Sequence, residues 1–202
     1  MSTRKPAEDR KAEIIEALLV IADRIGPDRL TTNDIARAVG VTQAAIFRHF
    51  PTKAELWSAT GEVIAERLGE AWQQAIAETT TPQAQLRALI AAQLRQIEAM
   101  PALPAILHSR ELNVDNPALR DRFRSLLRQY QALLVANLSA MIRDGAIRPG
   151  IPPEDAAILL TSLVQGMAIR WSLGARGFCL PEEGLRLLDV QLTLMTPSKD
   201  MT

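Results

Sequence analysis

The chain has 202 residues with 23 basic and 23 acidic side chains, so its formal net charge is zero and charge alone indicates no partner. One cysteine and two histidines exclude an intrachain disulfide and argue against a Cys/His zinc site, and we predict no metal and no cofactor. No apolar run approaches the ~20 residues of a membrane span and the N-terminus is charged, which favours a cytoplasmic protein with no membrane partner. Helix-forming residues dominate without strand-like alternation, so the predicted fold is all-α, with about nine helices.

The first predicted helix covers residues 9–25. Ile14, Leu18, Ile21 and Ile25 recur at helical spacing along it, and a Gly-Pro pair ends it. The stripe must pack against other helices, and the next two predicted helices supply apolar residues for that purpose.

Two short helices separated by a glycine follow the first one. Thr31 or Thr32 offers a side-chain oxygen to cap the first of them, and Gly40 supplies the left-handed residue that ends it. Thr42 caps the second, residues 43–49, which stops before a Phe-Pro pair. Two helices joined by a short glycine-containing turn form a helix-turn-helix.

The second of these helices has an inner and an outer face. Ile46 and Phe50 point toward the core. The side chains left outside are Gln43, Ala44, Phe47, Arg48 and His49. A short helix with this outer face is typical of one that enters the major groove of DNA.

The residue pattern of this region is specific. It reads Thr31-Thr32-x-x-Ile35-Ala36-x-x-Val39-Gly40-Val41-Thr42-x-x-x-Ile46-Phe47-x-His49-Phe50-x-x-Lys53-x-x-Leu56. This pattern closely resembles the DNA-binding signature of the TetR family of transcriptional regulators. Residues 144–157 also resemble that family, just before its penultimate helix.

The resemblance implies a domain organisation and a function. We expect a helix-turn-helix DNA-binding domain in residues 1–54 and an effector-binding and dimerisation domain in residues 55–202. The implied protein is a homodimeric, sequence-specific regulator, most often a repressor released by a small-molecule inducer. Its operator would be palindromic double-stranded DNA with half-sites on one face of the duplex.

Candidate DNA contacts come partly from the residues and partly from the resemblance. Gln43 can pair with adenine, Ala44 can meet a thymine methyl, and Arg48 can reach guanine or phosphate. The resemblance implies backbone contacts by Thr32, Thr42, Phe47, His49 and Lys53, although Phe47 lacks the hydroxyl of the usual tyrosine. The full predicted set is Thr31, Thr32, Thr42, Gln43, Ala44, Phe47, Arg48, His49 and Lys53. Two alternatives stay open, because Thr42 could serve only as a cap and His49 could pack beside Phe50.

Basic residues lie at both edges of this unit. Thr52-x-x-Glu55 predicts the start of a fourth helix, which puts Lys53 in a first helical turn where an anion is favoured. Arg4, Lys5, Arg10 and Lys11 precede or begin the first helix. They could reach phosphates or the minor groove as an N-terminal arm, or form a solvated start.

Helices are predicted over residues 82–100, 117–145 and 154–173 and from residue 181 onward. Between the first two of these, the sequence permits only a short helix that ends at about residue 110. The resemblance implies an inducer cavity among them. Its candidate lining comprises Trp72, Met100, Leu103, Leu107, His108, Glu111, Tyr130, Leu134, Gln165 and Trp171. Plain core is the favoured alternative for the apolar members, because large apolar residues at helical spacing need no ligand to explain them. An enzyme using His108 and Glu111 is disfavoured, since neither a second metal ligand nor a nucleophile motif accompanies them.

The last two helices carry more apolar residues than one buried face needs. Such helices are either central or shared with a partner, and we expect them to form a four-helix interface with a second copy. The predicted interface residues are Leu160, Val164, Met167, Leu185, Leu188, Leu192 and Met195. Burial within one subunit is the alternative. A further functional alternative is a constitutive helical DNA- or partner-binding protein that has no effector.

Overall fold

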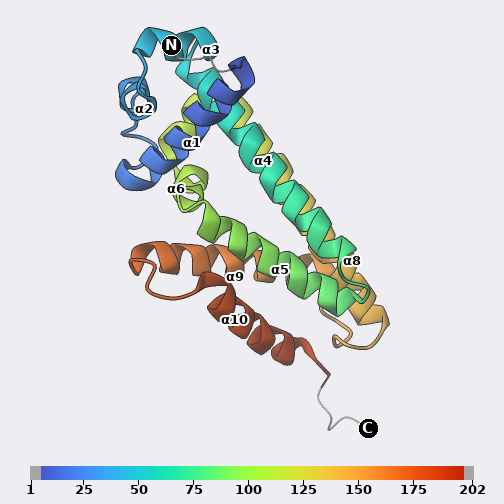
Figure 1. Cartoon of the computed structure of the whole chain (residues 1–202). Coiled ribbons are helices and arrows are strands. Elements are labelled where there is room, and N and C mark those ends of the chain that lie inside the picture. The colour runs from blue at the N-terminus through green and yellow to red at the C-terminus, as the bar shows by residue number, and fades with distance from the viewer. Residues whose placement is uncertain (1–5, 198–202) are drawn as a thin grey trace. The chain divides into compact units, whose positions relative to one another are not determined.

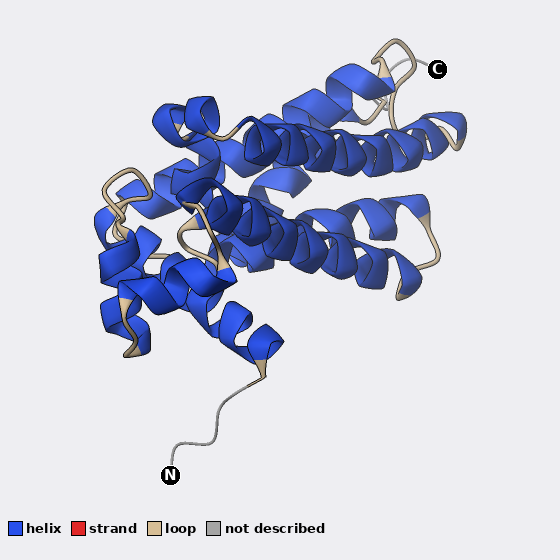
Figure 2. Cartoon of the chain, turned by 90° about the horizontal axis from the view of Figure 1, so that it is seen from above, coloured by secondary structure: helices blue, strands red, loops and turns tan. Residues whose placement is uncertain are grey.

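The computed structural model describes residues 6–197, and within this range the chain is helical with no strand (Figure 2). The helices of the described range are α1 (Ala7–Ile25), α2 (Thr32–Val39), α3 (Gln43–His49), α4 (Lys53–Ala77), α5 (Pro82–Ala99), α6 (Leu103–His108), α7 (Arg110–Asp115), α8 (Pro117–Arg143), α9 (Pro153–Leu173) and α10 (Leu180–Met195). The all-α prediction is confirmed.

One more helix is present than the sequence predicted, because the stretch after α5 forms two short helices. Ser109 leaves helical geometry with φ −65° and ψ 110°, and its hydroxyl accepts a hydrogen bond from the Leu112 amide at 2.9 Å. The same residue therefore ends α6 and caps α7.

The chain packs as two compact units. Unit 1 contains the chain up to Ala65 together with Met100–Arg124, and unit 2 contains Glu66–Ala99 and the chain from Ser125 onward. α4 and α8 contribute residues to both units. The functional boundary predicted at residue 54 stays a prediction, since these units describe packing only.

In unit 1, α1, α2 and α3 pack around a small apolar core. Ile14 and Leu18 of α1, Ile35 of α2 and Ile46 of α3 are all fully buried there. α6 also packs against α1. The Ser109 hydroxyl donates a hydrogen bond to Asp28, which ties the α6–α7 junction to the turn between α1 and α2.

The parts of α4 and α8 that belong to unit 1 lie close together. A Cβ added at Gly61 would stand 2.4 Å from a methyl of Leu119, so any other residue there would have to displace that side chain. Arg122 donates through Nε to Glu62 at 2.8 Å and forms a second bond through its Nη2. Packing and a two-point ion pair thus join the two helices within the unit.

In unit 2, α5, α9 and α10 pack against one another (Figure 1). Gly184 of α10 lies so close to α5 that a Cβ there would stand 2.4 Å from a methyl of Leu94. The Glu98 carboxylate accepts a hydrogen bond from the Leu180 amide at 3.1 Å, at the first turn of α10. Arg87 and Asp189 form an ion pair between the same two helices.

α9 is the one helix in the described range that is long and apolar enough to cross a membrane by length and composition. Its most apolar window has a mean hydropathy of 1.3 and is 44% buried inside the structure. Since the core helix of a soluble protein passes the same test, this is weak evidence for a span. Here the buried residues of α9 form part of the core of unit 2.

Candidate nucleic-acid interface

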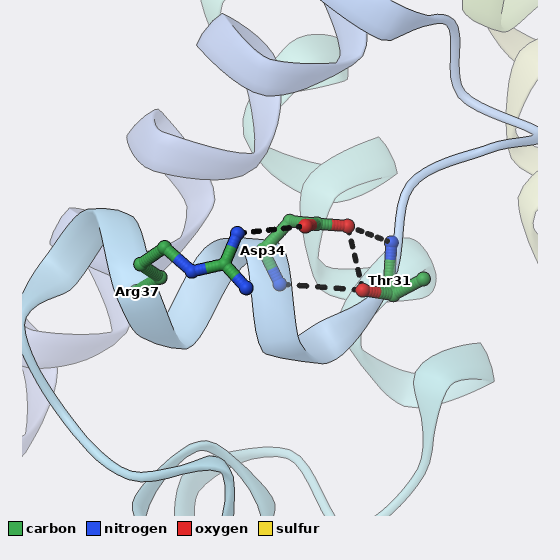
Figure 3. Close-up of polar contacts among 3 residues, drawn as sticks. All are labelled: Thr31, Asp34 and Arg37. Carbon is green, nitrogen blue, oxygen red and sulfur yellow. Dashed lines mark hydrogen bonds and ion pairs between the residues drawn. The ribbon is translucent and has the colours of Figure 1, made fainter.

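The first helix of the helix-turn-helix begins with a complete capping box (Figure 3). Thr31 Oγ1 accepts from the Asp34 amide at 3.3 Å, and Asp34 Oδ2 accepts from the Thr31 amide at 3.1 Å. The Thr31 hydroxyl also donates to Asp34 at 2.6 Å, while Arg37 lies 3.6 Å from the other carboxylate oxygen. These Thr31 hydrogen bonds, with a smaller contribution from Arg37, hold the pKa of Asp34 below its ordinary value. Of the two candidate caps, Thr31 is the one used.

The turn between α2 and α3 has the predicted geometry. Gly40 adopts φ 72° and ψ 35°, a left-handed conformation that glycine takes without strain. The Val41 amide donates to the Ala36 carbonyl at 2.9 Å, which closes the end of α2. Thr42 then caps α3, its hydroxyl accepting from the Ala45 amide at 3.2 Å. Thr42 is nevertheless exposed, so capping and a DNA contact are compatible.

α3 has one buried and one exposed face. Ile46 is fully buried, and Phe50 directly after the helix is 5% exposed. The exposed members of the predicted set on or beside this helix are Thr42, Gln43, Ala44, Phe47 and Arg48. His49 is half-buried, so both alternatives stay open for it, a DNA contact and packing beside Phe50. The Phe47 ring, 39% exposed, is an apolar element of this outer surface.

Thr32 differs from the other candidates. It is only 8% exposed, and its hydroxyl accepts a hydrogen bond from Gln43 Nε2 at 2.7 Å. This bond joins the first residue of α2 to the first residue of α3. Thr32 therefore positions Gln43, and the sequence offered no signal for a bond between residues eleven positions apart.

The start of α4 places a lysine beside the helix-turn-helix. The Thr52 hydroxyl accepts from the Glu55 amide at 3.1 Å and donates to the Glu55 carboxylate at 3.2 Å. Lys53 is the first residue of the helix and is exposed, while Leu56 and Trp57 anchor the same turn in the core. A cation held at this position is suited to a phosphate contact.

Two of the four basic residues at the N-terminus, Arg4 and Lys5, lie outside the described residues. The other two belong to α1 and pair with acidic residues one turn away. Arg10 bonds Glu13 at 2.8 Å, and Lys11 bonds Glu8 at 3.1 Å. Both alternatives for these residues stay open, because weak partly exposed pairs exchange readily for a phosphate.

The candidate effector residues are distributed over both units. Met100, Leu103, Leu107, His108 and Glu111 belong to unit 1; Trp72, Tyr130, Leu134, Gln165 and Trp171 belong to unit 2. The apolar members are buried except Leu107, whereas the polar members His108, Glu111 and Gln165 are all exposed. The unit 2 set does contain one cluster, in which the rings of Trp72 and Tyr130 lie 5.0 Å apart.

The predicted interface residues face the interior of their own subunit. Leu160, Val164, Met167, Leu188, Leu192 and Met195 are all buried, and Leu185 is half-buried. α9 is apolar nearly all round, so its periodicity does not reveal which side packs inward. The apolar side chains that α9 and α10 leave exposed are different ones, namely Ile158, Leu159, Ile169, Leu173, Val190 and Leu194.

Comparison with known families accounts for both parts of the chain. Residues 14–60 match the model of bacterial regulatory proteins of the tetR family. Residues 82–195, more than half of the chain, match the C-terminal region of BetI-type transcriptional repressors. The chain belongs to the TetR family. As a TetR-family protein it is a DNA-binding transcription regulator and not an enzyme, and proteins of this family typically form dimers.

Several relatives are similar over most of their length. The nucleoid occlusion factor SlmA of Vibrio atlanticus (strain LGP32) is 32% identical over 164 residues, which is 80% of this chain and 81% of that protein. SlmA of Vibrio cholerae serotype O1 is 31% identical over 158 residues, 77% and 79% of the two chains.

Solved TetR-family structures share the fold. The ketosteroid regulator KstR2 of Mycobacterium tuberculosis superposes with a TM-score of 0.80 at 19% identity, over 94% of this chain and 96% of that one. A TetR regulator from Haloarcula marismortui reaches 0.78 at 24% identity, over 94% and 100%. The regulator FadR of Bacillus subtilis, solved with stearoyl-CoA, reaches 0.74 at 18% identity, over 90% and 97%.

Proposed function

We propose that this TetR-family protein is a homodimeric, cytoplasmic transcriptional repressor that reads a palindromic operator and is released by a small-molecule inducer. The observation that carries the DNA-reading part is the outer face of α3. Gln43, Ala44, Phe47 and Arg48 stand exposed on a helix whose opposite side is anchored by the fully buried Ile46. A short, rigidly seated helix with such a face suits a major groove.

The contacts divide into two kinds. Gln43, Ala44 and Arg48 would meet base edges, where an amide suits adenine, a methyl suits thymine and a guanidinium suits guanine. Thr31, Thr42, Phe47, His49 and Lys53 would lie along the sugar-phosphate backbone. Thr32 would act through Gln43, because the Thr32 hydroxyl already accepts a hydrogen bond from the side-chain amide of Gln43.

Lys53→Ala tests the phosphate contact. Operator binding, measured by fluorescence anisotropy over a series of salt concentrations, should weaken for every sequence, and the slope of log K against log salt should fall by about one unit. Arg95→Ala is the matched control, since Arg95 is an exposed cation of α5 in unit 2. An unchanged slope for Lys53→Ala would remove the phosphate assignment, and absence of any sequence-selective binding by the native protein would remove the repressor proposal.

Support for an inducer comes from the interior of unit 2. The Tyr130 hydroxyl is fully buried with no hydrogen-bond partner, beside Trp72, whose indole N–H is already bonded to Gln93 at 2.9 Å. An unpaired hydroxyl inside a protein leaves a polar group that a ligand can satisfy. A thermal-shift screen of lipophilic and acidic metabolites, followed by operator release, would identify such a compound.

Dimerisation would use the apolar side chains that α9 and α10 expose. On α9, Ile158, Ile169 and Leu173 follow one another at helical spacing, and Gly166 lies among them with open space where a Cβ would be. A glycine at this place would let a second helix approach closely. We therefore assign the interface to this exposed face instead of the buried residues first predicted.

The relatives favour a second candidate, a DNA-binding protein that acts without an effector. SlmA is named as a nucleoid occlusion factor, and that role is stated for proteins about 30% identical to this chain. The two candidates differ in one measurement. A compound that both stabilises the protein and releases it from DNA supports the inducible repressor, whereas DNA binding that resists every stabilising compound supports the constitutive protein.

A further inference from the structure

The first residues of α2 and α3 are joined through their side chains. Gln43 Nε2 donates to Thr32 Oγ1 at 2.7 Å, although the two residues are eleven positions apart in the chain. The two ends of this bond lie in different environments, because Thr32 is 8% exposed whereas Gln43 is exposed on the outer face of α3. One end of the bond is therefore held by the core, and the other end carries a group that can meet DNA.

The backbone at each end of this bond is fixed by a helix cap. Thr31, directly before Thr32, forms the complete capping box of α2. Thr42, directly before Gln43, caps α3 by accepting a backbone N–H of that helix at 3.2 Å. Because both helix starts are capped, the Thr32 hydroxyl stands at a defined place beside the side chain of Gln43.

The bond to Thr32 uses only part of the Gln43 amide. The amide nitrogen has two hydrogens and the oxygen has two lone pairs, so one hydrogen and the oxygen remain for another partner. A donor beside an acceptor matches the N7 and N6–H₂ groups of adenine in the major groove. A glutamine side chain that is already held at its end loses less rotational freedom on binding than a free one. The bond therefore prepares the amide for a two-point contact before DNA arrives.

We propose that Thr32 determines specificity, because it holds the Gln43 amide where that amide pairs with adenine at one position of each operator half-site. This inference rests on the DNA-reading function proposed above. It differs from the backbone contact that the family resemblance implies for Thr32. A phosphate contact strengthens binding to every DNA sequence, whereas a positioning role strengthens binding only to sequences that carry the adenine.

Selection from a randomised double-stranded DNA library, followed by sequencing, measures the base preference of the full chain at each operator position. The position whose preference is lost in Gln43→Ala is the one that Gln43 reads. Thr32→Val replaces the hydroxyl by a methyl of similar size. It should lower the adenine preference at that same position roughly tenfold and leave the other positions unchanged. Thr32→Ser keeps the hydroxyl and should keep the preference.

Dissociation constants from fluorescence anisotropy separate positioning from a direct contact. On the selected operator, Thr32→Val should weaken binding roughly tenfold, but in a chain that already carries Gln43→Ala it should have almost no further effect. Thr60→Val is the matched control. Thr60 is also a buried threonine of unit 1, and its hydroxyl donates to the Leu56 carbonyl of its own helix at 2.8 Å. This control should leave every base preference unchanged.

Several results would overturn the proposal. They are native base preferences in Thr32→Val, equal weakening of all sequences, an additive loss in the double variant, or a Thr32→Ser protein that behaves like Thr32→Val. The free protein gives a check that needs no DNA. The side-chain amide signals of Gln43 in a proton–nitrogen NMR spectrum should move in Thr32→Val, and unchanged signals would also refute the positioning role. Failure of the proposed function looks different, because the native protein itself would then select no sequence, and both proposals would fall.

Discussion

Tyr130 shows what burial does to a single ionisable side chain. It is the only tyrosine of the chain, its hydroxyl has no partner, and burial raises its pKa far above the ordinary value of 10.0. The charged phenolate cannot form in this environment at the pH where an exposed tyrosine ionises. The native state therefore keeps a proton that the unfolded state releases.

The resulting prediction concerns alkaline stability. As pH rises above about 10, the unfolded chain loses the Tyr130 proton and the native chain does not, so the free energy of unfolding should fall with rising pH. Absorbance at 295 nm reports this one phenol. It should rise together with the loss of helical circular dichroism, whereas the urea-unfolded chain should titrate near 10. A phenol that ionises near 10 while the helices remain intact would contradict the burial.

The capping box makes the opposite prediction at acid pH. The Thr31 hydrogen bonds lower the pKa of Asp34 below its ordinary value of 3.8. The ionised carboxylate therefore stabilises the native state fully when the pH is above 3.8, and this contribution is lost as the pH falls through the lowered pKa. Asp34→Asn should therefore reduce stability to urea at pH 7 and have little effect at strongly acid pH. Asp155→Asn is the control, because Asp155 lies in the first turn of α9, whose N-cap residue Pro152 makes no side-chain cap bond. An Asp34→Asn effect that is equal at both pH values would refute the ionic contribution.

At the scale of helices, glycines mark where two elements touch. Gly184 and Gly69 are both helical, but only Gly184 faces a neighbour within 4 Å. The neighbour, Leu94, is fully buried and presents three atoms within 3.5 Å of the added Cβ. Because Leu94 has little room to move, a side chain at Gly184 would push α10 away from α5.

This contrast gives a matched pair of substitutions. Gly69→Ala should stabilise the protein by roughly 0.5–1 kcal/mol, since alanine favours the helix and meets nothing. Gly184→Ala should instead destabilise it, because overpacking costs roughly 1–3 kcal/mol and exceeds the helix gain. Urea unfolding of the two variants measures the difference directly. Equal stabilities would mean that Leu94 moves aside freely.

At the scale of the whole molecule, the proposed dimer depends on apolar side chains that one subunit cannot cover. Leu194 on α10 is 64% exposed, and Leu173 at the end of α9 is 82% exposed. Large exposed apolar side chains on two helices that pack together suit a partner surface. Operator binding by two α3 helices requires such a pairing, since a palindrome presents two half-sites.

Leu194→Asp tests the assignment. A charge at a buried apolar interface is unpaired and strongly unfavourable, so light scattering after size exclusion should show a monomer, and operator affinity should fall with it. Val20→Asp is the control, since Val20 is similarly exposed at 60% but belongs to α1. A Leu194→Asp protein that remains dimeric would move the interface elsewhere.

The limits of sequence prediction follow the range of the interactions. The end of α2 and the start of α3 are predictable from the sequence, because Gly40 and Thr42 act on amides and carbonyls only a few positions away. The break at Ser109 was local too, and a serine followed by Glu111 in the first turn was the available signal. The Thr32–Gln43 and Asp28–Ser109 bonds were not predictable, because nothing in the residues fixes which distant polar groups meet.

By itself, then, the sequence determined the helices, their caps and the outer face of α3, since periodicity and capping are properties of neighbouring residues. The tertiary structure decided which side of α9 packs inward, because a helix that is apolar nearly all round offers no preferred face until others pack against it. It also decided that Thr32 is a buried support and that Lys53 lines a pocket with Glu111. Those outcomes depend on residues that only folding brings together.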